Sequence, residues 1–353
     1  MKKLVSLLMA LCMMVSLAAC GGQEQTTDEG GAESDNGGYK IAFSNSYVGN
    51  PWRTAAVNIF DAYTADLVEQ GVLSKAYSSS AGDDVQAQIN EIRNMMSEGY
   101  DAIVCIAASA TGLQSVLEEA EERGIVVVCF DTTVDSDLVY NVNTDQFEYG
   151  RLLAQSLADR MGGEGNILWI KGIEGNRVTL DRTEGMQSVL DNYPGIKVLG
   201  DGYGKWDDST TASVMSNLMS AYASQGIDGI LSEGGGGHAI VQSLVENGID
   251  PATVPISEGE MFNSFMKDWV EMDLDAFCTA QPPYLAAAAV DVALKVLNGE
   301  EVEPMTYVDL PTCSSKEEAE EKWYQPDQEG GFVCDWTDNN NTWNLTIEDV
   351  APN

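Results

Sequence analysis

The feature that most constrains the fold of this chain is a regular alternation of short apolar segments with amphipathic ones, which begins at Tyr39. Segments such as Ile125–Phe130 are apolar on both faces, as is typical of a parallel strand covered by helices on each side. The predicted strands are Lys40–Asn45, Ala76–Ser80, Ala102–Ala107, Val126–Asp131, Val139–Asn143, Asn166–Lys171, Lys197–Asp201, Gly229–Glu233, Val254–Glu258 and Ala276–Gln281. Helical periodicity is clearest in Asp84–Glu98, Thr111–Arg123, Gln146–Met161 and Pro283–Leu297. This alternation predicts an α/β fold with right-handed βαβ crossovers and parallel sheets.

The pattern of strands and helices nearly restarts after Asn143. About ten strands are too many for one comfortable open sheet. The roughly 315 residues beyond Gly38 are enough for two domains with sizeable cores. We therefore expect two similar Rossmann-like lobes.

The N-terminus carries the pattern of an export signal. Lys2-Lys3 precede an apolar run from Leu4 to Leu17, and the run ends at Ala18-Ala19-Cys20. This order predicts a signal peptide over residues 1–19. The junction resembles a bacterial lipobox, in which the cysteine is lipidated; an ordinary secretory signal that happens to end in Cys is the alternative. Residues 20–38 are rich in Gly, Glu, Asp and Gln and predict a flexible tether. We expect a protein anchored by lipid at the cell surface or on the periplasmic side of the bacterial cytoplasmic membrane.

The strong negative charge excludes several kinds of partner. The formal net charge is −38, and removal of Lys2 and Lys3 with the leader would bring it to −40. Such a chain has no basic surface with which to neutralise phosphates, so nucleic acid is excluded. Binding to anionic lipid by charge is equally unfavourable. No second apolar run reaches membrane-spanning length, so the lipid is the only membrane attachment that we expect.

Polar and aromatic side chains recur where the predicted strands end. In open parallel sheets, ligands bind outside the carboxyl ends of the strands. The residues at these ends include Asn45, Asn50, Trp52, Arg53, Asp131, Asn176, Arg182, Tyr203, Trp206, Glu233, His238, Glu258, Glu260, Gln281 and Tyr284. Carboxylates, amides and guanidinium groups bond hydroxyls, and flat rings cover the apolar face of a sugar. The pattern predicts a site for a polyhydroxylated ligand.

A family resemblance rests on the order and spacing of several segments after the lipobox. They are IAFSNSYVGNPWR, GYDAIVCIAASATGL, VVVCFDTT, IEGNRVTLDRTEGM and AQPPYLAAAAVDVALKVLNGE. In this order they resemble the substrate-binding lipoproteins of sugar ABC transporters, and more narrowly the type I group that includes the ribose- and galactose-binding proteins. The resemblance implies two lobes with parallel sheets, joined by a three-strand hinge. Its crossings would fall near Val142-Asn143, Gln281-Pro282 and Pro304-Met305, which gives an N-terminal lobe of residues 39–142 and 282–304 and a C-terminal lobe of residues 143–281 and 305–353.

The resemblance also implies a set of ligand-binding residues. Trp52 and Trp206 take the places of the aromatic walls, and Asp131, Arg182 and Gln281 take those of hydroxyl-binding groups. Glu233 stands where Asn is usual, and Glu258 stands where Asp is usual. Together with Asn45, Arg53 and Asn176, these are the predicted site residues.

This chain also departs from the family pattern at several positions. Thr132 replaces the ribose-type Arg, Ile106-Ala107 replace an Asn, and Gly234–Gly237 lack side chains. We therefore expect a wider pocket that is specific for neither ribose nor galactose.

The function implied is that of a monomeric, non-catalytic binder that delivers a carbohydrate to an ABC permease. A sugar sensor that feeds a membrane receptor kinase would use the same lobes, and a secreted carbohydrate-active enzyme is a further alternative because paired carboxylates are plentiful. The only histidine, His238, has no His or Cys partner for a zinc site. We expect no cofactor, no metal and no catalytic residue.

The cysteines beyond the leader fall into two groups. Cys105, Cys129 and Cys278 lie in predicted core strands and are interpreted as small buried hydrophobic residues. Cys313 and Cys334 flank an acidic tail of an exported protein, where a disulfide is plausible. The alternative is two free thiols.

Overall fold

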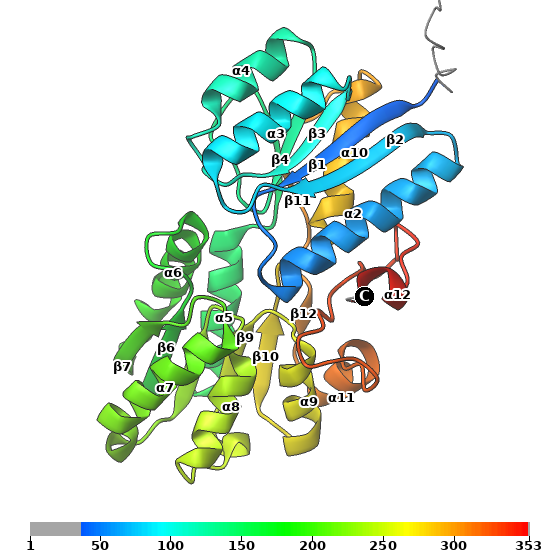
Figure 1. Ribbon diagram of the computed structural model, residues 1–353. Coiled ribbons are helices and arrows are strands. Elements are labelled where there is room, and N and C mark those ends of the chain that lie inside the picture. The colour runs from blue at the N-terminus through cyan, green and yellow to red at the C-terminus, as the bar shows by residue number, and fades with distance from the viewer. Residues whose placement is uncertain (1–36, 352–353) are drawn as a thin grey trace, which may run out of the picture. The chain divides into compact units, whose positions relative to one another are not determined.

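The first lobe is built on a parallel six-stranded sheet with strand order β11-β5-β4-β3-β1-β2. It is seen in a computed structural model that describes residues 37–351 (Figure 1). Its strands are β1 (Tyr39–Asn45), β2 (Leu73–Ser80), β3 (Ala102–Ile106), β4 (Val126–Phe130), β5 (Tyr140–Asn143) and β11 (Met305–Tyr307). Its helices are α2 (Pro51–Glu69), α3 (Val85–Ser97), α4 (Gln114–Glu122) and α10 (Leu285–Leu297).

The second lobe has its own six-stranded sheet, with strand order β12-β10-β9-β8-β6-β7. Its strands are β6 (Glu164–Lys171), β7 (Gly195–Tyr203), β8 (Gly229–Ser232), β9 (Ile256–Gly259), β10 (Ala276–Thr279) and β12 (Thr312–Cys313), of which only β12 runs antiparallel to its neighbour. Its helices are α5 (Gln146–Arg160), α6 (Arg177–Leu190), α7 (Asp208–Tyr222), α8 (Gly237–Glu246) and α9 (Asn263–Met272), with short 3₁₀ turns η1 (Ala223–Gln225) and η2 (Pro251–Thr253). The predicted two-lobed α/β fold is therefore confirmed.

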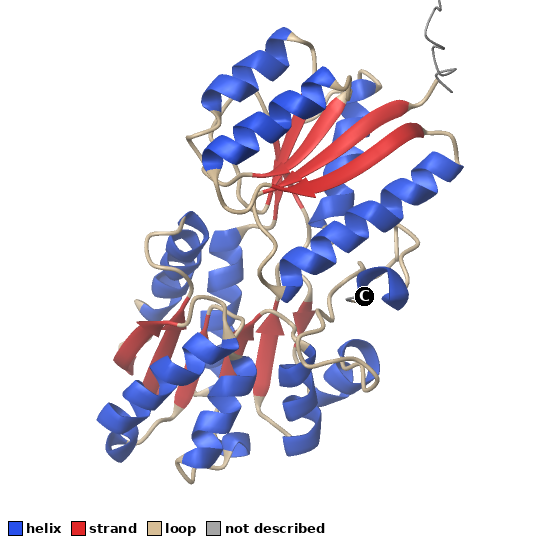
Figure 2. Cartoon of the chain, viewed as in Figure 1, coloured by secondary structure: helices blue, strands red, loops and turns tan. Residues whose placement is uncertain are grey.

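Helices cover both faces of each sheet, as Figure 2 shows. In β3, alternate residues pack to opposite sides: Val104 joins the core formed with α2 and α10, whereas Ile103 and Cys105 join the core formed with α3 and α4. In the second lobe, α7, α8 and α9 pack on one face, and α5 and α6 pack on the other. This double coverage is the physical reason that the central strands are apolar at every position.

The third crossing between the lobes lies later in the chain than predicted. The sequence places residues from 305 onward in the C-terminal lobe, but Met305–Tyr307 pair in parallel with Asn141–Asn143 in the first sheet. The chain therefore crosses between β11 and β12. The difference arises because β11 is only three residues long and carries no clear periodicity.

The segment after β12 also departs from the predicted boundary, because it contacts both lobes. It contains α11 (Lys316–Glu318), the π-helical turn η3 (Ala319–Trp323) and α12 (Ile347–Val350). The turn η3 packs against α9, but α12 packs against α2 of the first lobe. Assignment of residues 305–353 to the C-terminal lobe alone is therefore wrong.

Two sets of hydrogen bonds hold this segment in place. In the second lobe, the buried amide of Asn263 donates to the carbonyls of Gln325 (2.8 Å) and Gln328 (2.9 Å) and accepts the N–H of Gln325 (2.9 Å). In the first lobe, Trp343 Nε1 donates to Asp291 Oδ2 on α10 (2.8 Å). The C-terminal segment thus bridges the two lobes.

The predicted disulfide between Cys313 and Cys334 is absent, and both residues are free thiols. Cys313 Sγ lies 3.5 Å from the carbonyl oxygen of Ser315, and Cys334 Sγ lies 3.6 Å from Asn263 Oδ1. Each thiol therefore has a separate local acceptor. Cys105, Cys129 and Cys278 are buried free thiols, as predicted.

None of the helices within residues 37–351 is long and apolar enough to cross a membrane. The predicted signal peptide, Cys20 and almost all of the tether lie outside the described residues.

We predict that Asn263→Ala will lower the free energy of unfolding. Asn263 is 3% exposed, and loss of its side chain would leave three half-buried backbone groups of Gln325 and Gln328 without partners. The expected cost is at least about 2 kcal/mol, measured by urea denaturation. The control is Asn339→Ala, at an exposed position of the C-terminal segment that Asn263 holds in place. It should change the free energy of unfolding by less than about 0.5 kcal/mol. Equal effects of the two substitutions would show that Asn263 has no special role.

Candidate functional site

A cavity of about 390 Å³ lies at the carboxyl ends of strands from both lobes. We call it the central cavity. Its lining residues are Ser46, Tyr47, Asn50, Trp52, Arg53, Asp83, Ala107, Ala108, Asp131, Thr132, Ile173, Asn176, Val178, Arg182, Lys205, Trp206, Glu260, Phe262 and Gln281. Seven of the predicted site residues are among them, namely Trp52, Arg53, Asp131, Asn176, Arg182, Trp206 and Gln281. The structure therefore brings together residues that are far apart in the sequence.

Local sequence positions the first of these residues. Asn50 caps α2, because its side chain accepts the backbone N–H of Arg53 at 2.8 Å, and Pro51 occupies the first helical position. Both features favour a helix that begins here. The first turn of α2 therefore carries Trp52 and Arg53 to the edge of the cavity.

Arg53 and Asp131 form the polar wall of the first lobe. Arg53 Nη2 donates to Asp131 Oδ2 at 3.0 Å, while its Nη1 bonds Asn45 Oδ1 at 3.1 Å and Ser46 Oγ at 3.0 Å. On the other side, Gln281 Nε2 donates to Asp131 Oδ1 at 2.5 Å. Asp131 is thus held between a cation of the first lobe and an amide of the hinge.

Arg182, on α6, organises the wall of the second lobe. Its Nε donates to Gln146 Oε1 at 2.8 Å, and its Nη1 donates to the carbonyl of Glu233 at 2.8 Å and to Glu260 Oε1 at 3.3 Å. The guanidinium also lies over the ring of Tyr149, with its carbon 3.6 Å from the ring centroid. At 2% exposure, Arg182 is the only buried Lys or Arg within residues 37–351.

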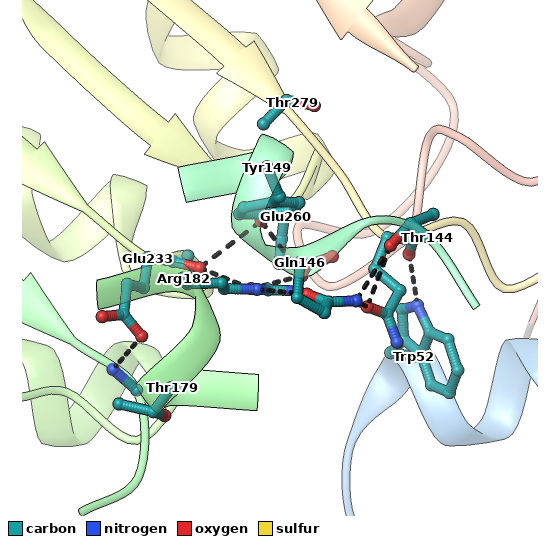
Figure 3. A network of polar contacts seen from close by, with 12 residues as sticks. Trp52, Thr144, Gln146, Tyr149, Thr179, Arg182, Glu233, Glu260 and Thr279 are labelled. Carbon is teal, nitrogen blue, oxygen red and sulfur yellow. Dashed lines mark hydrogen bonds and ion pairs between the residues drawn. The ribbon is translucent and has the colours of Figure 1, made fainter. Parts of the chain in front are cut away.

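A continuous polar network joins the two walls through the hinge. Gln146 Nε2 donates to Gln281 Oε1, and Trp52 Nε1 donates to the carbonyl of Gln281 at 2.6 Å. Figure 3 shows these contacts running from Glu233 through Arg182 and Gln146 towards Trp52. The cavity walls of the two lobes are therefore linked by a short chain of hydrogen bonds.

Three predicted site residues do not line the central cavity. Asn45 instead holds Arg53, as described above. The carboxylate of Glu233 accepts the N–H of Gly172 at 2.9 Å and the hydroxyl of Thr183 at 2.8 Å, so it supports the loop after β6. Glu258 lies within β9, and its Oε1 accepts the N–H of Gly236 at 3.1 Å.

Glu260 lies in the central cavity in place of Glu258. The sequence contains both carboxylates, and the alternation of a strand gives them the same face. Glu258 belongs to β9, however, and Glu260 follows its end. Stricter use of the rule that ligands bind beyond the strand ends would have selected Glu260. The remaining lining residues that sequence reasoning missed are mostly loop residues: Ser46, Tyr47, Asp83, Ala108, Ile173, Val178, Lys205 and Phe262.

Burial alters the titration of the site carboxyls. It raises the pKa of Glu233 to about 7 and that of Glu258 to about 8, because water no longer stabilises the charged form. Burial also raises the pKa of Glu260, although the nearby Arg182 opposes this shift. The second lobe therefore contains three carboxyls that hold their protons more tightly than usual.

The glycine run at 234–237 is explained by packing rather than by a wider central cavity. A Cβ on Gly235 would lie 2.5 Å from the backbone of Trp206, and one on Gly236 would lie 2.3 Å from Thr211 Oγ1. A Cβ on Gly237 would meet the ring of Phe265 at 2.6 Å. Trp206 itself has a φ of +55°, a strained conformation for a bulky residue. The glycines permit the close approach that holds the indole at the cavity wall.

These features define a two-lobed binding protein with a preformed cavity between its lobes. Comparison with known families agrees: the periplasmic binding protein domain matches residues 41–301, so the chain belongs to the periplasmic binding protein family. This is a family of binding proteins rather than of enzymes.

Individual relatives share about a third of their residues with this chain or fewer. The chain is 31% identical over 172 residues to the xylitol-binding protein of Mycolicibacterium smegmatis, and the match covers 48% of this chain and 49% of that protein. It therefore spans about half the length of this curated relative. Among solved structures, an ABC transporter solute binding protein from Thermobispora bispora is similar with a TM-score of 0.74 and 20% identity, over 88% of this chain and 95% of that one.

A second solved structure is that of an ABC transporter periplasmic solute binding protein from Actinobacillus succinogenes with bound D-allose. It has a TM-score of 0.69 and 21% identity, over 80% of this chain and 99% of that one. At these identities the structures establish a common fold.

We predict that stability will fall as pH rises between about 4.5 and 8. The folded-state pKa of Glu258, about 8, lies above the ordinary value of 4.5, so in this window the folded protein holds a proton that the unfolded chain has released. The free energy of unfolding must then decrease with pH, and Glu233 acts in the same direction. Urea denaturation at about pH 5 and pH 8 should show the decrease.

The variant Glu258→Gln tests the cause of this pH dependence. Its amide does not titrate, so its stability should fall less between the two pH values than that of the wild type. Parallel behaviour of the two proteins would contradict the assignment.

Proposed function

We propose that this protein captures a neutral sugar or sugar-like ligand between its two lobes and delivers it to an ABC permease. The observation that carries the proposal is the charge balance of the central cavity. Although the whole chain has a formal charge of −38, the cavity is lined by equal numbers of cationic and anionic side chains. The cationic side chains are Arg53, Arg182 and Lys205, and the anionic ones are Asp83, Asp131 and Glu260.

The pairing of these charges favours a ligand that both donates and accepts hydrogen bonds. Arg53 pairs with Asp131 at 3.0 Å, and Arg182 pairs with Glu260 at 3.3 Å. A charged ligand would have to displace one partner of such a pair, whereas hydroxyl groups can bond to both partners. Glu260 Oε2 is buried and has no partner among the described residues, so it is an acceptor available to a hydroxyl.

Two aromatic side chains complete the proposed site. Trp52, from the first lobe, and Trp206, from the second, both line the cavity. We propose that they face opposite sides of the ligand, where flat rings cover the apolar C–H surface of a sugar. Asp131, Arg182, Glu260 and Gln281 would bond its hydroxyls, and the lobes would close about the hinge as in other periplasmic binding proteins.

The names of the relatives support a carbohydrate or polyol. They include a xylitol-binding protein, the D-xylose-binding periplasmic protein of Escherichia coli and the multiple sugar-binding periplasmic receptor of Rhizobium radiobacter. Attachment to the membrane through a lipidated Cys20 is part of the same proposal. It rests on the lipobox-like sequence before the tether.

We predict that Trp206→Ala will weaken ligand binding. The ligand is first found by thermal-shift screening of the tether-free protein against xylitol, pentoses and hexoses, since a ligand at a hundredfold its Kd adds about 2.7 kcal/mol to stability. Calorimetric titration should then show that Trp206→Ala binds at least about tenfold more weakly, because a stacking wall is lost. Tyr77→Ala, an exposed aromatic of β2 that does not line the cavity, should bind as the wild type does.

Unchanged affinity in Trp206→Ala would contradict the placement of the ligand. Chemical conversion of the sugar by the wild type would contradict a purely binding role.

We also predict that Cys20→Ser will release the protein from membranes. Without the thiol, no lipid can be attached. Mass spectrometry of the native wild type should find an acylated Cys20 as the first residue, and fractionation should place the variant in the soluble fraction. A variant that stays with the membrane would contradict the anchor.

A further inference from the structure

A second cavity of about 670 Å³ adjoins the central cavity. We call it the flanking cavity. The two cavities lie side by side, because they share six lining residues: Tyr47, Asn50, Lys205, Trp206, Glu260 and Phe262. A volume of this size is ordinary for a complete small-molecule site. The flanking cavity is therefore larger than a side passage for water would need to be.

The polar groups of the flanking cavity do not suit an anion. The N-terminus of α8 lies at its wall, and such an end would normally attract a phosphate. Here Glu258 Oε1 accepts the N–H of Gly236 at 3.1 Å, and Asp208 Oδ1 accepts the N–H of Ala239 at 2.9 Å. Two carboxyl side chains of the protein thus already accept amide N–H groups at this helix end, so those amides are not available to a phosphorylated or acidic sugar.

The same wall presents a carboxyl oxygen that has no hydrogen-bond partner in the described part of the chain. Glu258 is 1% exposed, it lines the flanking cavity, and its Oε2 has no partner within residues 37–351. At the junction of the two cavities, Glu260 Oε2 is likewise buried and without a partner. Buried carboxyl oxygens of this kind are costly unless a hydrogen-bond partner reaches them, and the hydroxyls of a neutral ligand are suitable partners because they both donate and accept.

Aromatic side chains supply the complementary apolar surface. Trp206 lines both cavities, and Phe262 and Tyr47 do the same. Phe265 is added on the flanking side only. Aromatic rings beside carboxyl oxygens that lack partners within the described residues thus occur in the flanking cavity as they do in the central cavity.

From these observations we infer that the ligand is a saccharide of at least two sugar units, with one neutral unit in the central cavity and the next in the flanking cavity. The linkage would pass Trp206 and Glu260, which border both volumes. This inference rests on the proposed function, because it presumes that the central cavity binds a sugar. It adds the length of the ligand and the neutrality of its second unit.

The test compares monosaccharides with their dimers on the tether-free protein, residues 37–353. Calorimetric titration would use D-xylose with xylobiose, D-glucose with maltose and cellobiose, and D-galactose with galactobiose. We expect at least one dimer to bind at least about tenfold more tightly than its monosaccharide. If some monosaccharide binds and no dimer binds better, the inference is overturned while the proposed function stands. If no saccharide binds at all, the proposed function fails, and the inference fails with it.

A matched pair of variants locates the second unit. Ser264 lines the flanking cavity and does not line the central one. Ser264→Phe should fill part of the flanking cavity and remove the advantage of the dimer, while Ser264→Ala should keep it. Retained affinity for the monosaccharide shows that Ser264→Phe is folded. A dimer that binds Ser264→Phe as tightly as it binds the wild type would overturn the placement of its second unit.

Discussion

The geometry of the site depends on the burial of one cation, the guanidinium of Arg182. A cation removed from water is tolerated only when hydrogen bonds and opposite charge surround it. Arg182 obtains these partners from Gln146 on α5, from the carbonyl after β8, from Glu260 after β9 and from Gln281 in the hinge. One charge therefore fixes the ends of several segments relative to one another, and these ends form the wall of the second lobe.

The acidity of the chain and the neutrality of its cavity have different physical consequences. A formal charge of −38 keeps the surface repulsive towards other acidic molecules and says little about the fold. The central cavity, in contrast, is lined by as many cationic as anionic side chains, two pairs of which are in contact, and we propose that this balance favours a neutral ligand. In the flanking cavity, Glu258 and Asp208 already accept amide N–H groups at the N-terminus of α8. These amides are therefore not free to bind an anionic ligand.

The C-terminal segment adds a constraint that the hinge alone would not supply. Asn263 ties residues 325–328 to the second lobe, while Trp343 and Asp291 tie the segment to α10 of the first. Close packing also occurs beside the cavity, since a Cβ on Gly331 would lie 3.3 Å from the ring of Pro51 at the start of α2. Movement of one lobe relative to the other would flex this segment or break contacts at one of its ends, so the lobe closure that we propose would involve more than the three crossing strands.

The sequence by itself determined the two-lobed α/β fold, because strands apolar on both faces require helices on both sides of a parallel sheet. The strand ends and the resemblance to sugar-binding lipoproteins together also predicted that Trp52, Arg53, Asp131, Asn176, Arg182, Trp206 and Gln281 belong to one site, and all seven line the central cavity. The prediction selected Glu258, which lies inside β9, although Glu260, which follows the end of β9, is the residue that lines the cavity, and the sequence could not decide whether Cys313 and Cys334 are bonded. A three-residue strand such as β11 carries too little periodicity to reveal its sheet. These points depend on distances between segments far apart in the chain, and only the packing of the folded molecule sets such distances.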